Sequence, residues 1–476
     1  MNNRYQSANW FTRGSYLLAG GARGMIGNGV SFFLLIYYSQ AIGLDPKLAG
    51  LALLISLCFD AVSDPIIGYW SDRFRSRWGR RHPFMYVSIL PISLFFYGLW
   101  TPPQLDQTGL FIYLTFMTVG LRLTLTPFSV PFNAMVPDIT SDYDERTHLL
   151  NYTVSGAWLF GGFMTMAMFW YWLADTPGTP SGSGLLNVQG YVDAGTVVAV
   201  IIFGFLTLAA VGTHGHIPYL NTAAHKPMNL KIVLGELKQT LNDRSLFAML
   251  ISGIFGAAAG GTGATLWIYI QSYFWEFTSQ QNGILAASQT LSVMVALSLL
   301  GRLTQQKEKK RVLIQLTILS MLVTTGPIYL RLSGFFPGNH TDLLFYVMVA
   351  FGIAWVSLLI MIAVLTGSMI TDLVESRELE TGRREEGVLL AANSFVEKVS
   401  GGIGVWAGGI ALAVISFPLN VDVSSVTPET IENLGWTYAS ILVVLYAISI
   451  GAVTFYTLDR SQHEENVRQL AIRQVE

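Results

Sequence analysis

Apolar residues gather in long runs that short polar stretches separate along almost the whole chain. An α-helix needs about 20 apolar residues to cross a bilayer, and longer runs can tilt or extend beyond it. Twelve runs reach helical length: residues 15–42, 47–70, 84–101, 109–134, 150–174, 191–213, 246–272, 279–302, 312–331, 343–368, 388–416 and 435–457. The pattern predicts an all-α membrane protein with twelve transmembrane helices.

Basic residues alternate between the loops. They cluster after the second, sixth, eighth and tenth runs and in the C-terminal tail, whereas the alternate loops are nearly free of them, with Lys47 and Arg331 as exceptions. Because cytoplasmic loops carry an excess of Lys and Arg, both termini are predicted to be cytoplasmic.

The polar segment 214–245 is the longest predicted cytoplasmic connection, and it divides the runs six and six. We therefore expect an N-terminal half (1–213), a linker (214–245), a C-terminal half (246–457) and a cytoplasmic tail (458–476). Two six-helix halves built around a central site are the plan of a major-facilitator transporter.

Composition excludes several other classes of protein. The chain of 476 residues is 52% apolar and only 12% charged, against about 25% charged in soluble domains. Basic residues cluster only in short loops, so nucleic-acid binding is not expected. The single cysteine, Cys58, excludes an internal disulfide. We see no filter-like sequence, so a channel is not expected. We see no metal-spaced histidines and no nucleophile–base pair, so an enzyme is not expected.

Two acids, Asp60 and Asp64, interrupt the second apolar run. Residues four apart share one face of a helix, and a carboxylate at the bilayer centre costs about 2.5–3.5 kcal/mol. Two carboxylates on one face need a cation, a proton or a basic partner. The spacing favours an ion site over a pair of structural salt bridges.

The residues around these acids resemble a known family. Residues 60–68 (Asp-Ala-Val-Ser-Asp-Pro-Ile-Ile-Gly), 71–73 (Ser-Asp-Arg) and 77–83 (Arg-Trp-Gly-Arg-Arg-His-Pro) are similar to the glycoside–pentoside–hexuronide:cation symporters of the major facilitator superfamily. Further matching motifs are residues 131–137, 142–147, 372–375, 381–387 and 395–398. The resemblance covers nearly the whole chain. It implies a monomer in the bacterial inner membrane that imports a small solute with Na⁺, Li⁺ or H⁺.

The resemblance also implies a cation site. Asp60 and Asp64 fall on the two cation-site acids of the family, and Ser63 and Thr126 fall on positions near the ion. Carboxylate and hydroxyl oxygens are the ligands that hard cations prefer. Lys398 falls on an intramembrane lysine of the family and is expected to couple the halves by competing with the ion. The alternative for Lys398 is snorkelling to the interface.

The sugar site of the galactoside-transporting members is not retained. An acid of that site is Gly24 here, and an Asp and a Trp on the fourth span are Ser129 and Asn133. We therefore expect a solute other than a simple galactoside. Arg23 and Arg122 can pair with an anionic solute such as a hexuronide, or they can have a structural role by satisfying Asp60 and Asp64 or stabilising helix ends; for Arg122 we favour the structural role. A lysolipid or another amphiphile is the alternative solute.

Other polar or aromatic residues are expected to face the central cavity. Together with the two arginines, the predicted substrate-binding set is Arg23, Asn28, Arg122, Ser129, Asn133, Trp158 and Asn393.

Charged residues near the predicted cytoplasmic ends are expected to form a gate. They are Arg73, Arg77, Arg80, Arg81, Asp142, Asp144, Arg146, Asp372, Arg383, Arg384 and Glu386. A single exposed ion pair contributes only about 0–1 kcal/mol, so a gate requires a network. The alternative is that these charges only fix the topology.

Overall fold

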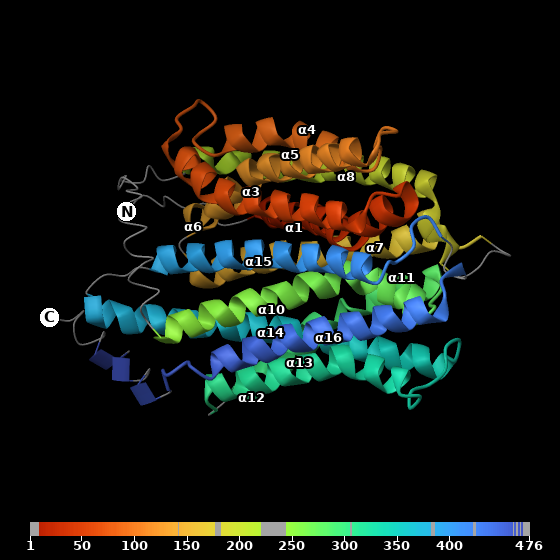
Figure 1. Ribbon diagram of the computed structural model, residues 1–476. Helices are drawn as coiled ribbons and strands as arrows, with labels where there is room; N and C mark the ends of the chain where they lie inside the picture. The colour runs from red at the N-terminus through yellow and green to blue at the C-terminus, as the bar shows by residue number, and fades with distance from the viewer. Residues whose placement is uncertain are drawn as a thin grey trace. The chain divides into compact units, whose positions relative to one another are not determined.

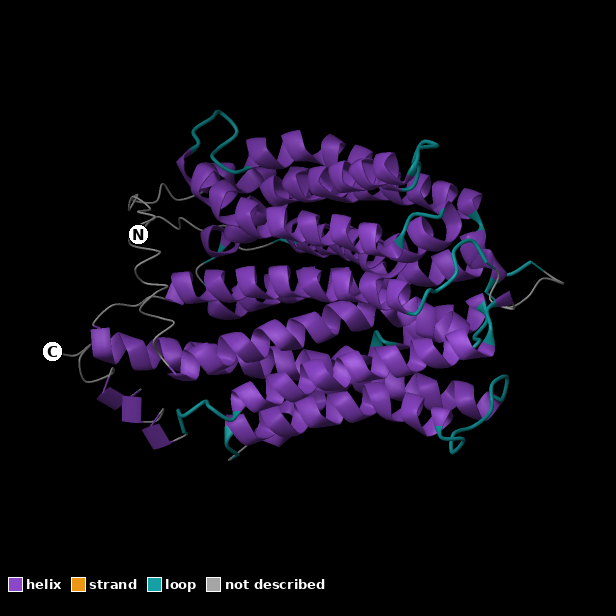
Figure 2. Ribbon diagram, viewed as in Figure 1, coloured by secondary structure: helices purple, strands orange, loops and turns teal. Residues whose placement is uncertain are grey.

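The chain folds into α-helices joined by short turns, as a computed structural model shows (Figures 1 and 2). The structure describes residues 9–140, 142–176, 182–219, 244–304, 307–381, 386–421, 425–459, 461–462, 465–466 and 468–469. Strands are absent from these described residues. The predicted all-α class is confirmed.

Each of the twelve predicted runs contains a helix. In the first half they are α1 (Trp10–Asn28) continued by η1 (Gly29–Phe33), α2 (Leu34–Ile36) and η2 (Tyr37–Ile42), then α3 (Pro46–Arg73), α4 (His82–Leu99), α5 (Gln107–Ala134) with α6 (Val136–Ile139), α7 (Tyr143–Ala167) with η3 (Met168–Trp172), and α8 (Val188–Thr213). In the second half they are α10 (Arg244–Tyr269) with η6 (Ile270–Phe274), α11 (Ser279–Ser288) with α12 (Leu291–Thr304), α13 (Lys309–Leu332), α14 (Asp342–Thr381), α15 (Glu386–Val414) and α16 (Pro428–Val453).

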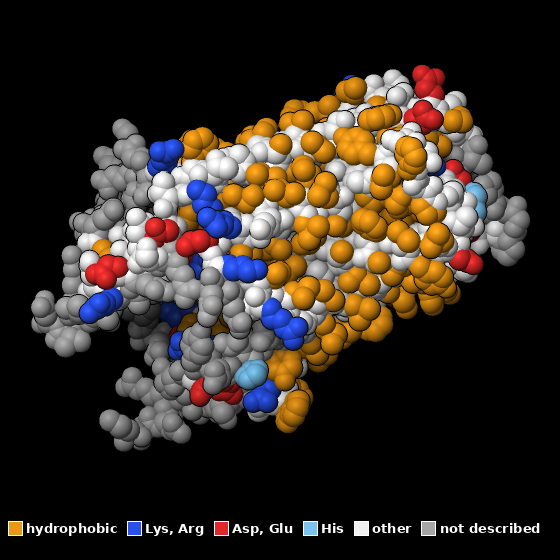
Figure 3. Space-filling model, turned by 90° about the horizontal axis from the view of Figure 1, so that it is seen from below, with side chains coloured by type: hydrophobic (Ala, Val, Ile, Leu, Met, Phe, Trp, Pro, Cys, Tyr) orange, Lys and Arg blue, Asp and Glu red, His pale blue; other side chains and the backbone are white. Residues whose placement is uncertain are grey.

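Ten of the spans among the described residues are long and apolar enough to cross a membrane, and α7 and α15 occupy the fifth and eleventh predicted runs. On the face shown in Figure 3, hydrophobic side chains cover the middle, and charged side chains gather toward the two ends. This distribution fits a protein whose middle lies in hydrocarbon.

Local sequence explains where several helices begin. Side chains of Asn9, Asp45, Asp106 and Asn187 accept hydrogen bonds from backbone N–H groups in the first turns of α1, α3, α5 and α8. Such caps satisfy donors that have no partner within the helix.

Prolines lie inside two helices that carry predicted site residues. Pro65 follows Asp64 in α3, and Pro127 follows Thr126 in α5. A proline removes one N–H from the hydrogen-bond ladder of its helix, which membrane helices tolerate where neighbouring groups satisfy the freed carbonyl. The backbone is therefore locally interrupted beside the predicted cation site.

The chain divides into two compact units. Unit 1 contains Met1–Lys226, Ala264–Ala287 and Val405–Ile431, and unit 2 contains Pro227–Gly263, Ser288–Gly404 and Glu432–Glu476. The predicted linker 214–245 lies largely outside the described residues, and the predicted division into halves stays a prediction.

Within unit 1, α1 and α7 approach closely. A Cβ atom added at Gly20 would lie 1.9 Å from the carbonyl oxygen of Thr153, and one at Gly156 would lie 2.0 Å from that of Leu17. Glycines allow such contact between membrane helices. The approach places the polar residues of α1 and α7 beside each other.

Later segments of the chain complete one end of unit 1. The hydroxyl groups of Tyr269 and Ser39 form a hydrogen bond, and the Gln40 side chain donates to the Pro418 carbonyl at 3.1 Å. The Asp175 carboxylate accepts hydrogen bonds from the backbone N–H (3.0 Å) and hydroxyl (3.1 Å) of Ser279. These contacts hold the end of α10, η6 and the segment after α15 against the N-terminal helices.

Candidate functional site

A polar cluster lies between α3 and α5 in unit 1. Asp60 is 6% exposed, and its Oδ1 accepts a hydrogen bond from the Thr126 hydroxyl at 3.2 Å. The Ser63 hydroxyl lies 3.1 Å from that of Thr126 and donates to the Asp60 carbonyl at 3.1 Å. The structure thus brings together three of the four residues predicted to bind a cation.

Arg122 joins this cluster from α5. Its Nη1 lies 3.7 Å from Asp60 Oδ2, and its backbone carbonyl accepts from the Thr126 hydroxyl at 3.1 Å. The structure places Arg122 at the acid, which was one of the two roles left open for it. With Asp64, two carboxylates and one guanidinium share this region, so the formal charge of the three ionised groups is −2 + 1 = −1.

Asp64, the fourth predicted ligand, lies one turn further along α3 and is half-buried. The oxygens of Asp60, Ser63, Asp64 and Thr126 are carboxylates and hydroxyls, which suit a hard cation. Lys398 lies half-buried on α15 in unit 2, and its coupling role stays a prediction.

A second polar region is a small cavity in unit 1. Its volume is about 20 Å³, enough for one water molecule. Arg23 of α1, Ser129 and Asn133 of α5 and Thr153 of α7 contribute polar groups to its wall, and apolar side chains complete it. Three predicted substrate residues therefore line one space.

The polar groups of this cavity are largely unused. Arg23 is exposed although it lies within a membrane span. Across the described part of the chain, its guanidinium makes no ion pair and no hydrogen bond, and the side chains of Ser129 and Asn133 make no hydrogen bond. An intramembrane charge of this kind makes the cavity a candidate functional site.

The remaining predicted substrate residues lie elsewhere. The Asn28 side chain donates to the Thr165 hydroxyl at 3.1 Å between α1 and α7. Trp158 is half-buried on α7 and does not line this cavity. The side chain of Asn393 lies outside the described residues.

A buried ionic cluster joins α6 to the end of α3 and to the turn before α4. Asp138 Oδ2 lies 2.8 Å from Arg81 Nη1 and 3.1 Å from Arg80 Nη2, and Arg81 also lies 3.7 Å from Asp72. The side chains of Asp138, Arg81 and Arg80 are only 9%, 6% and 11% exposed. Burial lowers the pKa of Arg81, and the charge of Asp138 opposes that shift.

Asp138 was missed by the sequence analysis. The available signal was an acid at the end of the fourth apolar run, together with five arginines in the loop after the second. Which acid pairs with which arginine depends on how the loops fold over the helix ends, and spacing along the chain does not specify that.

Other predicted gate residues have local roles. The Asp142 carboxylate accepts from the backbone N–H of Glu145 at 2.9 Å and so caps α7. The Arg146 guanidinium donates to the Thr140 carbonyl at 2.8 Å. The Arg73 guanidinium lies 3.3 Å from the centre of the Tyr69 ring, and Arg77 is exposed.

In unit 2, the predicted gate residue Asp372 binds Lys309 Nζ at 2.6 Å. The sequence analysis did not assign Lys309 to the gate. Arg383 and Arg384 lie outside the described residues, as do the side chains of Asp144 and Glu386.

Comparisons with known proteins identify the family of this chain. The family described as MFS/sugar transport protein matches residues 15–460. The putative glycoside/cation symporter YagG of Escherichia coli is 25% identical, covering 96% of this chain and 93% of its own. The putative 2,3-dihydroxypropane-1-sulfonate exporter of the same organism is 25% identical, with 93% and 91% covered.

Solved structures show the same fold. The nucleoside transporter NupG superposes with a TM-score of 0.63 at 13% identity, covering 94% of this chain and 100% of that one. The match to the major-facilitator architecture confirms the predicted fold class. The family is one of transporters and not of enzymes. The chain therefore belongs to the MFS/sugar transport protein family and is a multi-pass membrane transporter.

Proposed function

We propose that the protein is a cation-coupled symporter that imports a small hydroxylated anion by alternating access, in the bacterial inner membrane with both termini cytoplasmic. The observation that carries the proposal is the buried Asp60–Thr126–Ser63 cluster between α3 and α5, which are both long and apolar enough to cross a membrane. The name of the relative YagG, a glycoside/cation symporter, supports cation coupling.

The coupling ion binds at the carboxylates of Asp60 and Asp64 and at the hydroxyls of Ser63 and Thr126. Na⁺ and Li⁺ are hard cations that prefer such oxygens, and H⁺ can bind the same carboxylates. Ion binding favours the arrangement that binds solute, and solute must favour ion binding by the same free energy. Lys398 competes with the ion when the halves approach.

The solute is an anion that binds at Arg23. A guanidinium within a membrane span is costly unless it is paired, and a carboxylate or sulfonate oxygen pair matches its geometry. The side chains of Ser129 and Asn133 lie beside Arg23 on the wall of the same small cavity, and they supply hydrogen bonds for hydroxyl groups of the solute once alternating access widens this space. An acidic glycoside fits these groups, and the relative named as a 2,3-dihydroxypropane-1-sulfonate exporter is consistent with a hydroxylated anion.

Thermal unfolding of the purified protein tests the ion site, because a ligand that binds only the folded state raises its stability. We expect Na⁺ or Li⁺ to raise the Tm above that in K⁺, or the Tm to depend on pH if the ion is H⁺. The double substitution Asp60→Asn and Asp64→Asn abolishes this response. The matched control, Asp193→Asn, changes an exposed acid on α8 and retains it. A response that persists in the double variant contradicts the proposed ion site.

The same measurement identifies the class of solute. We expect stabilisation by a hexuronide or by 2,3-dihydroxypropane-1-sulfonate, and loss of that stabilisation in Arg23→Gln but less loss in Arg23→Lys. If only neutral galactosides or lysolipids stabilise the protein, and Arg23→Gln does not change this, the proposal of an anionic solute is contradicted. The proposed ion site is not affected by that result.

A further inference from the structure

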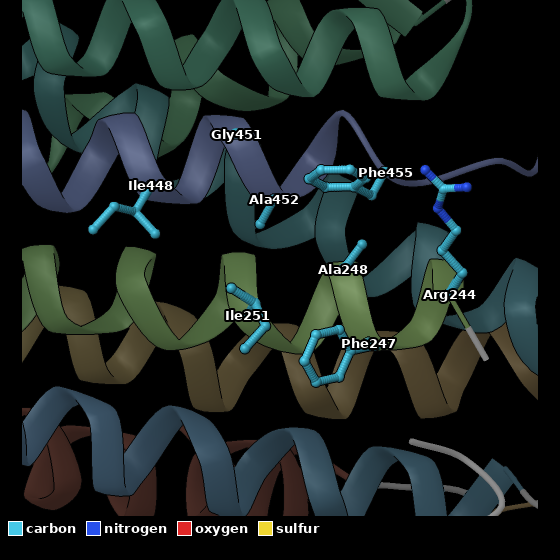
Figure 4. Close-up of a pocket in the computed structure, with 8 residues that line it drawn as sticks. All are labelled: Arg244, Phe247, Ala248, Ile251, Ile448, Gly451, Ala452 and Phe455. Atoms are coloured by element: carbon cyan, nitrogen blue, oxygen red, sulfur yellow. The ribbon is translucent and has the colours of Figure 1, made fainter. Parts of the chain in front are cut away.

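A groove runs between α10 and α16 in unit 2, well separated in sequence from the cavity of unit 1. Its volume is about 520 Å³. One wall is formed by Arg244, Phe247, Ala248 and Ile251 of α10, and the other by Ile448, Gly451, Ala452 and Phe455 of α16 and the turn after it. Figure 4 shows these side chains along the space between the two helices, with Arg244 and Phe455 toward one end.

The walls of this groove are apolar and open to the surroundings of the chain. Phe247 is 49% exposed, Ile448 39% and Phe455 53%. Small residues leave space at the bottom of the groove, since a Cβ atom added at Gly451 would have no atom within 4 Å. Both helices are long and apolar enough to cross a membrane, and the apolar, exposed walls of the groove suit contact with hydrocarbon. A narrow apolar groove fits a hydrocarbon chain, because an empty one forfeits dispersion contacts along both walls.

Two cations stand at one end of the groove. Arg244 is the first residue of α10, and its guanidinium lies 5.3 Å from the centre of the Phe455 ring, a cation–π distance. Lys310 Nζ donates to the carbonyls of Thr454 and Tyr456, each at 2.7 Å, on either side of Phe455 in the sequence. Within the described residues neither cation forms an ion pair.

We propose that this groove binds an anionic phospholipid of the bilayer. One acyl chain lies along Phe247, Ile448 and Gly451, and the phosphate faces Arg244 and Lys310. The position of the cations at the end of a membrane span supports this, because phospholipid phosphates lie at that depth and basic pockets between membrane helices bind anionic head groups. A zwitterionic lipid carries its own amine beside the phosphate and gains less from the two cations. The inference does not depend on the proposed transport function.

Native mass spectrometry of the full chain, extracted and exchanged into a 1:1 mixture of phosphatidylglycerol and phosphatidylcholine, tests the proposal. We expect one phosphatidylglycerol to be retained preferentially by the wild type. Arg244→Gln removes the charge, and Gly451→Leu adds a side chain to the groove at a position where a Cβ atom meets nothing within 4 Å. Each is expected to lower the retained phosphatidylglycerol at least fivefold.

Matched controls separate lipid recognition from changes in folding. Arg302→Gln removes an exposed charge on α12, and Gly301→Leu adds a side chain at an open position of the same helix; both are expected to retain the lipid, as is Arg23→Gln in the solute cavity. If Arg244→Gln fails to fold, Gly451→Leu alone decides. Equal retention of the two lipids by the wild type, or unchanged retention in Gly451→Leu, overturns the proposal. A dimer that Gly451→Leu dissociates also overturns it, because the occupant is then a second copy of the chain.

Discussion

Arg122 neutralises one of the two carboxylates that are proposed to hold the coupling cation. Its guanidinium lies 3.7 Å from Asp60 Oδ2, so its positive charge weakens the negative potential that would attract Na⁺ or Li⁺. We expect Arg122→Gln to raise the affinity for these cations about tenfold, which corresponds to about 1.4 kcal/mol. Calorimetric titration of the purified protein measures this affinity.

Arg122→Lys is the control for this substitution, because it keeps the charge and is expected to bind cations nearly as the wild type does. Weaker cation binding in Arg122→Gln would show that Arg122 supports the ion site and does not compete with the ion.

Asp138 compensates two buried guanidinium groups, those of Arg80 and Arg81. Removing one partner of a buried ion pair costs about 3–5 kcal/mol, because the other charge stays buried. We expect Asp138→Asn to lower the free energy of unfolding by about that amount, and chemical unfolding in detergent measures it. Asp142→Ala, which removes a helix cap, is expected to cost about 1 kcal/mol. Equal effects of the two substitutions would argue against the buried cluster.

At the residue scale, the sequence predicted the acids but not all of their partners. Spacing along the helix indicated Asp60 as an ion-site acid, and the family resemblance alone indicated Ser63 and Thr126. The pairing of Arg122 with Asp60 was one of two open roles, since it depends on the rotation of α5 against α3. Within the described residues Arg23 has no partner for its charge. A local sequence pattern cannot predict this, because it depends on which polar groups the other helices place nearby.

The contact between α1 and α7 depends on glycine. A Cβ atom at Gly156 would lie 2.0 Å from the Leu17 carbonyl, so Gly156→Val forces the two helices apart. Overpacking of this kind typically costs about 1–3 kcal/mol. The control is Gly204→Val on α8, where an added Cβ atom meets nothing within 4 Å. We expect a lower Tm for the first variant alone; similar Tm values for both would contradict the close approach.

At the scale of elements, hydropathy predicted every span but not its details. The tenth run was expected at 343–368, whereas α14 continues to Thr381 because polar residues can extend a helix beyond the bilayer. The eighth run contains two helices, α11 and α12, that are separated at residues 289–290. Hydropathy reports the depth of residues in the membrane, and it does not report such breaks or the π-helical turns of η1 and η2.

The packing at one end of unit 1 gives a prediction for the whole molecule. Gln40 is fully buried there, and the hydrogen bonds that Ser279 donates to the Asp175 carboxylate help to hold the covering segments. In a Cys58→Ser background, we expect Gln40→Cys to react slowly with a water-soluble maleimide. Adding Asp175→Ala should increase the rate several-fold by opening this end.

Asp193→Ala serves as the control, because this exposed acid lies on α8 and accepts a hydrogen bond from Gln189 on the same helix, and it should leave the labelling rate unchanged. Fast labelling of Gln40→Cys before Asp175 is changed would contradict the covered state of this end.

At the scale of the whole molecule, the span count and family were predictable from hydropathy and motifs. The membership of residues 264–287 and 405–431 in unit 1 was not, because it arises from contacts between segments far apart in the chain.

The measurement that bears most directly on cation coupling is solute accumulation in proteoliposomes under an imposed inward Na⁺ or H⁺ gradient. The probes are a radiolabelled hexuronide and 2,3-dihydroxypropane-1-sulfonate. The proposed function predicts that the wild type accumulates at least one of them above equilibrium only while a gradient exists, and that the Asp60→Asn, Asp64→Asn double variant does not. Accumulation by the double variant equal to that of the wild type would contradict a coupling site at these two acids.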